Sequence, residues 1–143
     1  MQGDQVDEQS VAFLQETEVG IQTAHLGPCW QVAWSHPKFE SLVATCGYDR
    51  FVKVWKEVAK SQWRCVYKYQ AEASVNCIQF APHEYGLSLV AGSADGKILV
   101  FEYQGHFGNW AEPQKLAAHN SGVTSLQWGP PQDPCLLLAE QID

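Results

Sequence analysis

Two short stretches decide the fold, because they match when the sequence is shifted by 46 residues: Ala33-Trp34-Ser35-His36-Pro37 and Gln79-Phe80-Ala81-Pro82-His83. The same step carries Asp49 to Asp95 without a gap. A further step of 48 residues carries the second stretch onto a third repeat, where Trp128 takes the place of Phe80. A repeat in the mid-forties is the size of one four-stranded blade of a β-propeller.

Each repeat also contains the residue pattern of four strands. Apolar and polar residues alternate over residues 30–34, and turn-forming residues separate short runs rich in β-branched and aromatic side chains. No amphipathic helical period is present after residue 24. The predicted strands cover 30–34, 42–46, 51–56 and 62–68 in the first repeat, 75–80, 87–91, 97–103 and roughly 109–116 in the second, and 123–128 and 135–139 in the third.

The pattern therefore predicts an all-β chain, a β-propeller fragment with two full four-stranded blades and a partial third. We expect an acidic N-terminal arm over residues 1–23, with an edge strand near its end. The three blades should cover residues 24–69, 70–117 and 118–143. Two and a half blades leave apolar faces and sheet edges open, so we expect the isolated chain to self-associate.

Charge and cysteine content narrow the function classes. The formal net charge is −7, yet residues 1–24 hold five acidic side chains and no Lys or Arg, so the remaining part is close to neutral. A near-neutral body predicts no nucleic-acid partner. No apolar run is long enough to span a bilayer, so we expect no direct membrane insertion. The five cysteines show no CxxC spacing and indicate reduced thiols in the cytosol or nucleus.

Four residues of the first repeat carry a family resemblance. A histidine precedes the inner strand (His25), a hydroxyl lies on the second strand (Thr45), an aspartate lies in the turn (Asp49), and a tryptophan lies on the third strand (Trp55). In this combination the repeat resembles a WD repeat. The resemblance implies a buried hydrogen-bonded chain in which the four groups satisfy one another. We therefore expect Asp49 to be buried and bonded to His25.

The second repeat keeps only the aspartate of this set. Asp95 and Gly96 form its turn, while Ala71, Ala91 and Phe101 stand at the other three positions. We expect Asp95 to serve only this turn. The third repeat keeps the histidine, as His119.

A more specific resemblance covers about residues 22–131. Residues 25–37 and 74–86 closely resemble the family of small WD-repeat subunits that the COPII outer coat shares with the Y-shaped scaffold of the nuclear pore. It implies a structural scaffold of ER-to-Golgi transport and of the pore, completed by strands from a larger partner, either the large outer-coat subunit or the equivalent nucleoporin. The implied locations are the cytoplasm, the COPII coat at the ER membrane, and the nuclear envelope. Two alternatives are the sister nucleoporin and another WD-repeat adaptor, such as a ubiquitin-ligase substrate receptor.

The sequence gives weaker support to a catalytic or ligand-binding function. His25, Thr45 and Asp49 could be mistaken for a catalytic triad, but a buried structural network is favoured. The histidines and cysteines match no metal-ligand spacing, and the sequence predicts no enzyme activity and no cofactor. Six basic residues between Arg50 and Lys68, offset only by Glu57, form either a solvated blade rim or a surface for an acidic partner or membrane headgroups. We expect Trp34, Phe80 and Trp128 to lie in the core between blades.

Overall fold

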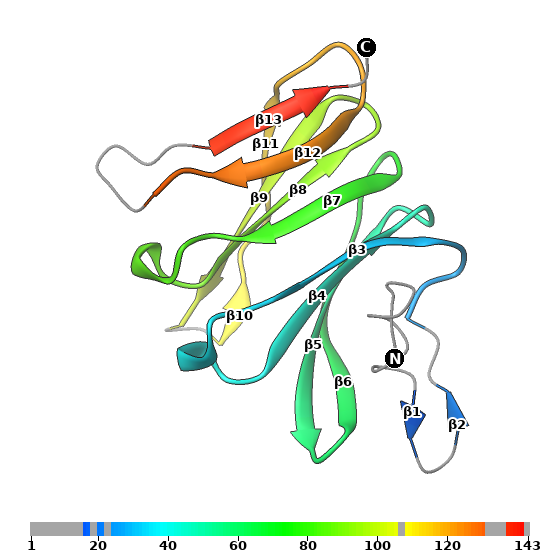
Figure 1. Ribbon diagram of the computed structural model, residues 1–143, viewed down its shortest axis with the longest axis vertical. Coiled ribbons are helices and arrows are strands. Elements are labelled where there is room, and N and C mark those ends of the chain that lie inside the picture. Colours follow the sequence, from blue (N-terminus) through cyan, green and yellow to red (C-terminus); the bar gives the residue numbers. More distant parts are fainter. Residues whose placement is uncertain (1–15, 18–19, 22–23, 106–107, 131–136, 142–143) are drawn as a thin grey trace.

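The computed structural model describes residues 16–17, 20–21, 24–105, 108–130 and 137–141, which form antiparallel sheets that follow one another along the chain (Figure 1). The first sheet has the strand order β3-β4-β5-β6. Its strands are β3 (Cys29–Trp34), β4 (Leu42–Gly47), β5 (Phe51–Ala59) and β6 (Gln62–Gln70). Two short strands, β1 (Glu16–Thr17) and β2 (Gly20–Ile21), pair only with each other among the described residues.

The second sheet repeats this arrangement, with one difference in its outermost strand. Its first three strands are β7 (Val75–Phe80), β8 (Ser88–Ser93) and β9 (Lys97–Gln104). The expected fourth strand is divided into β10 (Asn109–Trp110) and β11 (Gln114–Ala117), and both pieces pair with β9. Pro113 lies in the break, where it has no N–H to donate to a ladder. The described part of the third sheet pairs β12 (Val123–Trp128) with β13 (Leu137–Gln141).

The sequence repeat reappears as a repeat of strand register. Cys29 pairs with Gly47 in the first sheet, Val75 with Ser93 in the second, and Val123 with Gln141 in the third. In all three sheets a bulge follows this pair, at the same position of the first strand. A bulge bends a strand and increases its twist. The steps of 46 and 48 residues are therefore structural periods.

Single turns of 3-10 helix connect the first two strands of the first and second sheets, where we expected no helix. They are η1 (Pro37–Phe39) and η2 (His83–Tyr85). In η1 the His36 side chain accepts a hydrogen bond from the Lys38 backbone N–H, and Pro37 has a backbone angle suited to the first position. Three residues are too few for the amphipathic period by which a sequence reveals a helix.

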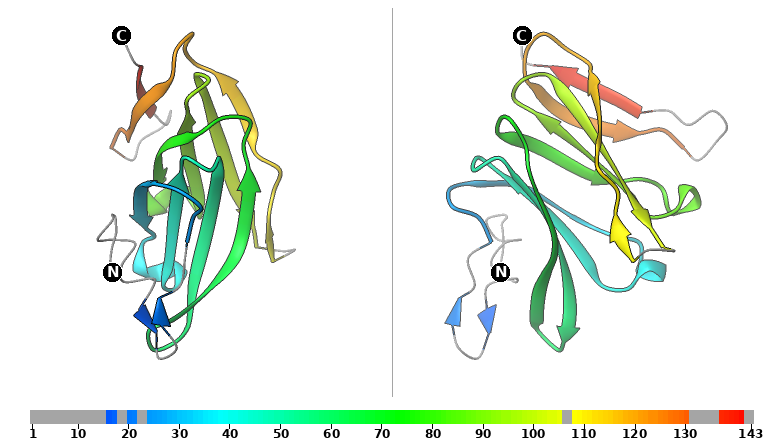
Figure 2. Two further views of the ribbon diagram at one scale, coloured as in Figure 1. Left: turned by 90° about the vertical axis from the view of Figure 1, so that its right-hand side faces the viewer. Right: turned by 180° about the vertical axis from the view of Figure 1, so that it is seen from behind.

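Successive sheets lie beside one another (Figure 2), and the apolar core lies between them. One buried cluster joins the first sheet to the second, through Val52 and Val54 on one side and Ile78 and Phe101 on the other. A second cluster, which includes Val90 and Val123, joins the second sheet to the third. Alternate residues of one strand face opposite neighbours, so both faces of the middle sheet are apolar.

Hydrogen bonds also tie the first strands of neighbouring sheets together. The Gln31 side-chain oxygen accepts from the backbone N–H of Ile78 at 2.9 Å. The Asn76 side-chain amide donates to the backbone oxygen of Val123 at 2.9 Å. Because hydrogen bonds are directional, these bonds fix how far each sheet is shifted along its neighbour, which apolar contact alone does not do.

The expectation that Trp34 lies between blades is wrong. Trp34 is 57% exposed, and its ring meets that of Trp63 edge-on at 5.8 Å. Phe80 and Trp128, the equivalent residues of the next two sheets, do pack against the inter-sheet clusters. At this position the side chain points toward the preceding sheet, and the described residues place no full sheet before the first one.

Candidate functional site

The four residues singled out in the first repeat form one continuous chain of hydrogen bonds. His25 Nδ1 donates to Asp49 Oδ1 at 2.9 Å, and its other nitrogen, Nε2, lies 2.8 Å from Thr45 Oγ1. Trp55 Nε1 donates to the same hydroxyl oxygen at 3.1 Å. With the proton on Nδ1, the Thr45 hydroxyl donates to Nε2 and accepts from the indole, so each group has a partner.

This network connects two strands of the first sheet, the turn between them and the segment that enters the sheet. Thr45 lies on β4, Trp55 on β5, Asp49 in the turn between them, and His25 in the segment before β3. Thr45 is fully buried, the His25 side chain is 1% exposed and that of Asp49 is 8% exposed. Such burial gives the network a structural role and leaves no open face on which a substrate could meet it.

The Asp49 carboxylate also binds backbone N–H groups, which the sequence pattern does not indicate. It accepts hydrogen bonds from the N–H groups of Leu26 at 3.0 Å and Phe51 at 3.2 Å. Burial acts to raise the pKa of Asp49, but the hydrogen bond and charge of His25, together with these two N–H groups, lower it below its ordinary value. The carboxylate therefore clamps the turn to the segment that enters β3.

A glycine that sequence reasoning missed makes this approach possible. A Cβ on Gly47 would lie 2.8 Å from the backbone oxygen of Pro28, 3.1 Å from His25 Nδ1 and 3.2 Å from Asp49 Oδ1. No L side chain fits there without moving the backbone of Pro28. The signal in the sequence was the position of Gly47 two residues before Asp49, and alone it also fits an ordinary turn.

In the second sheet, the aspartate makes local contacts only. Asp95 accepts hydrogen bonds from the Ser93 hydroxyl and from the Lys97 backbone N–H, and the Lys97 ammonium group lies 3.7 Å from its carboxylate. These partners belong to the turn and its two flanking strands. The three positions of the missing polar partners carry Ala71, Ala91 and Phe101, all buried.

The third sheet retains an isolated member of the network. His119 has a buried Nε2 atom with no hydrogen-bond partner among the described residues. The register shows why, since Ala139 pairs with Leu126 just as Thr45 pairs with Val32, and alanine has no hydroxyl to offer.

These repeated sheets match a known family. Residues 16–56 and 63–102 fit the family model described as WD domain, G-beta repeat. The chain belongs to the WD-repeat family. The crystal structure of Sqt1 from Saccharomyces cerevisiae superposes with a TM-score of 0.61 at 22% identity, covering 73% of this chain and 26% of that one. At this identity the likeness shows the propeller fold alone.

Curated relatives of this chain carry SEC13 names. The chain is 44% identical over 111 residues to the protein SEC13 homolog of Drosophila melanogaster, covering 77% of this chain and 31% of that protein. It is 45% identical over 128 residues to the protein transport protein SEC13-2 of Candida glabrata, covering 87% and 40%. The chain therefore spans less than half the length of these relatives.

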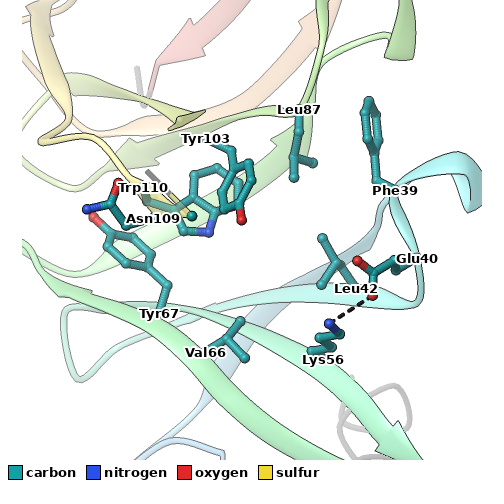
Figure 3. A pocket seen from close by; sticks show the side chains of 11 residues that line it. Phe39, Glu40, Leu42, Lys56, Val66, Tyr67, Leu87, Tyr103, Asn109 and Trp110 are labelled. Carbon is teal, nitrogen blue, oxygen red and sulfur yellow. Dashed lines mark ion pairs between the residues drawn. The ribbon is translucent and has the colours of Figure 1, made fainter. Parts of the chain in front are cut away.

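A groove lies between the first two WD blades, and aromatic side chains of both blades line one end of it (Figure 3). Its volume is about 450 Å³. The Trp110 ring stacks on Tyr67 at 5.7 Å and meets Tyr103 edge-on at 5.5 Å, so it bridges the two sheets. Burial, followed by the charge of Glu112, raises the pKa of Tyr67 to about 12, so its hydroxyl stays protonated at neutral pH. Lys56 and Glu40 form an ion pair at the rim, at 2.8 Å.

The described residues form no metal-binding cluster, and two of their buried thiols are held in the protonated form. They contain no group of three or more His, Cys, Asp or Glu side chains able to hold a metal ion. Burial raises the pKa of the Cys46 thiol well above its ordinary value and that of Cys77 to about 11, which keeps both protonated. No helix in the described part of the chain is long and apolar enough to cross a bilayer.

Proposed function

We propose that this chain acts as a structural scaffold subunit of the COPII vesicle coat in ER-to-Golgi transport, and of the nuclear pore scaffold. The single observation that carries the proposal is its identity of 44–45% to proteins named SEC13, one of them named as a protein transport protein. The polar network supports a scaffold role over an enzyme role. Its histidine and aspartate hold a turn in place through hydrogen bonds, and their side chains are buried away from any substrate.

The proposed mode of action is strand complementation at a blade edge. A larger partner, the large outer-coat subunit or the equivalent nucleoporin, would add strands that continue the propeller, since open sheet edges offer N–H and C=O groups to a partner strand. The scaffold would then work in the cytoplasm, at the COPII coat on the ER membrane, and at the nuclear envelope.

Affinity purification of the tagged full chain, followed by mass spectrometry, tests this function. We expect recovery of the large outer-coat subunit or of nucleoporins of the Y-shaped scaffold. Recovery of a ubiquitin-ligase scaffold without either of them would support the substrate-receptor alternative and contradict the proposal. A matched control is the chain with Asp49→Ala, in which the first blade should be weakened and recovery should fall.

A further inference from the structure

The groove between the first two blades opens where the outer strands of both sheets are irregular. In the first sheet, a register shift leaves Val66 of β6 as a bulge residue with no partner on β5. In the second sheet, Pro113 lies between the two pieces of the outer strand. Val66, which is 44% exposed, lines the groove from one sheet and Trp110 lines it from the other. A bulge bends its strand and redirects side chains, which accounts for an opening between sheets that otherwise pack closely.

One end of this groove carries basic side chains. Lys56 lines the groove, and Arg64 stands directly opposite Lys56 in the β5–β6 register. Residues directly opposite each other in an antiparallel pair project from the same face of the sheet, so Arg64 extends beside the groove as well. Glu40 pairs with Lys56 at 2.8 Å, whereas no acidic group among the described residues pairs with Arg64. This end of the groove therefore favours an added carboxylate.

A strained backbone holds Glu40 at this end. Its φ is 76° and its ψ is −174°, a region that residues other than glycine rarely adopt. The equivalent residue of the second sheet, 46 positions later, is Gly86, with a φ of 87° and a ψ of −171°. The first sheet therefore keeps a carboxylate beside Lys56 at a position where the second sheet has a glycine. Strain of this kind is typical of functional positions.

The other end of the groove has the opposite charge. The charge of Glu112 acts on Tyr67, and Figure 3 shows Tyr67 at the end of the groove away from Lys56. Leu87 and Trp110 belong to the apolar part of the lining. An acidic ligand should therefore lie in one direction, with its carboxylate at the Lys56 end.

We propose that this groove binds a short extended peptide of a partner protein, with a large apolar side chain against Trp110 and Leu87 and a carboxylate on Lys56 and Arg64. The carboxylate takes the place of Glu40, which holds Lys56 in the free chain. Side chains of an extended peptide recur on one face at every second residue, so the acidic residue lies two positions from the apolar one. The volume of about 450 Å³ is within the range of ligand sites. This binding is independent of the proposed coat function.

A phage-displayed library of random short peptides, selected on the immobilised full chain, tests the proposal. We expect enrichment of sequences in which a leucine, isoleucine or aromatic residue stands two positions from an aspartate or glutamate. The most enriched peptide, labelled with fluorescein, is then titrated by fluorescence anisotropy. Arg64→Glu should weaken its binding by about tenfold, because an attraction becomes a repulsion.

The same strand provides a matched control. Lys68 is exposed on β6 like Arg64, but it pairs with Lys53 and so projects from the opposite face of the sheet. Lys68→Glu makes the same change of charge sign and should leave the affinity within about twofold of the wild-type value.

Two further changes test the apolar contact and the competing carboxylate. Val66→Asp should weaken binding by about tenfold, because it puts a charge of the wrong sign into the groove. Val58→Asp is its control, since Val58 is also an exposed bulge residue of the β5–β6 pair but does not line the groove. Glu40→Gln should strengthen binding by about threefold, because Lys56 then loses its competing partner.

Several outcomes would overturn the proposal. Selection might enrich no sequence of the expected kind, the peptide might bind Arg64→Glu and Lys68→Glu equally well, or Glu40→Gln might weaken binding. Light scattering of the free chain gives the last one. If Arg64→Glu, but not Lys68→Glu, converts a dimer to a monomer, the groove is filled by a second copy of the chain and the proposed occupant is wrong.

Discussion

The first and second sheets share one strand register but hold their turns by different means. Every pair in the β4–β5 ladder, such as Val43 with Trp55, reappears 46 residues later in the β8–β9 ladder, as Leu89 with Phe101. The first sheet adds a buried network of four side chains, whereas the second fills three of those positions with apolar residues. The ladder therefore does not need the network. Apolar residues at alternate positions set the register, and the network adds local stability to one turn.

The two turns also differ in backbone conformation and crowding. Arg50 and Gly96 occupy equivalent positions and both have positive φ, 73° and 86°. A Cβ on Gly96 would overlap the backbone oxygen of His119 and would lie 2.9 Å from that of Ser121. The segment that leads into the third sheet therefore lies so close to the turn of the second sheet that only a glycine fits there.

The largest expected effect tests this crowding. Gly96→Ala should lower the free energy of unfolding by about 4 kcal/mol, because strain at positive φ adds to a clash with backbone that cannot rotate away. Arg50→Ala keeps a side chain at the same φ and should cost less than about 1 kcal/mol. Urea denaturation followed by circular dichroism measures both, and similar losses in the two variants would show that the third sheet does not crowd this turn.

The next largest effect tests the polar network. Asp49→Ala leaves His25 Nδ1 and the N–H groups of Leu26 and Phe51 without their acceptor, so we expect a loss of about 3 kcal/mol. Asp95→Ala should cost about 1 kcal/mol, because its carboxylate is 30% exposed and water can replace it. Thermal or urea unfolding compares the two. Equal losses, or the reverse order, would mean that the network contributes nothing beyond an ordinary turn.

A third comparison concerns equivalent buried positions on the second strands. The first sheet has Cys46 where the second has Gly92, and a Cβ on Gly92 would lie 2.5 Å from Val123 Cγ1 and 2.7 Å from Cys77 Sγ. We expect Gly92→Ala to destabilise the chain by about 2 kcal/mol through overpacking. Cys46→Ala only removes a sulfur atom and should cost about 1 kcal/mol. If Gly92→Ala were neutral in urea denaturation, the third sheet would pack less tightly on the second than described.

The smallest expected effect is a pH dependence confined to the first turn. Folding lowers the pKa of Asp49, so its ionised form stabilises the folded chain above the unfolded-state pKa of about 3.9. This contribution is lost as the pH falls through the lower folded-state value. The stability difference between the wild-type chain and Asp49→Asn should therefore shrink from pH 6 toward pH 2.5 in urea titrations. A difference that stays constant over this range would show that the folded-state pKa is not lowered.

Much of the network could be predicted from the sequence, because its members lie at fixed positions of a repeat. His25, Thr45, Asp49 and Trp55 meet in space as the resemblance implied. The backbone donors on Asp49 and the need for Gly47 could not be predicted, since both depend on how closely the entering segment approaches the turn. The break of the outer strand at Pro113 could have been anticipated, because proline cannot donate to a ladder.

The sequence by itself determined the repeat, the strands and their apolar faces, because alternation and spacing are local properties of the chain. Only the tertiary structure decided what each repeated position meets. Trp34, Phe80 and Trp128 are equivalent in sequence, yet Trp34 is 57% exposed while the other two pack against the preceding sheet. Burial depends on the neighbour that a side chain faces, and that neighbour lies one whole sheet away along the chain.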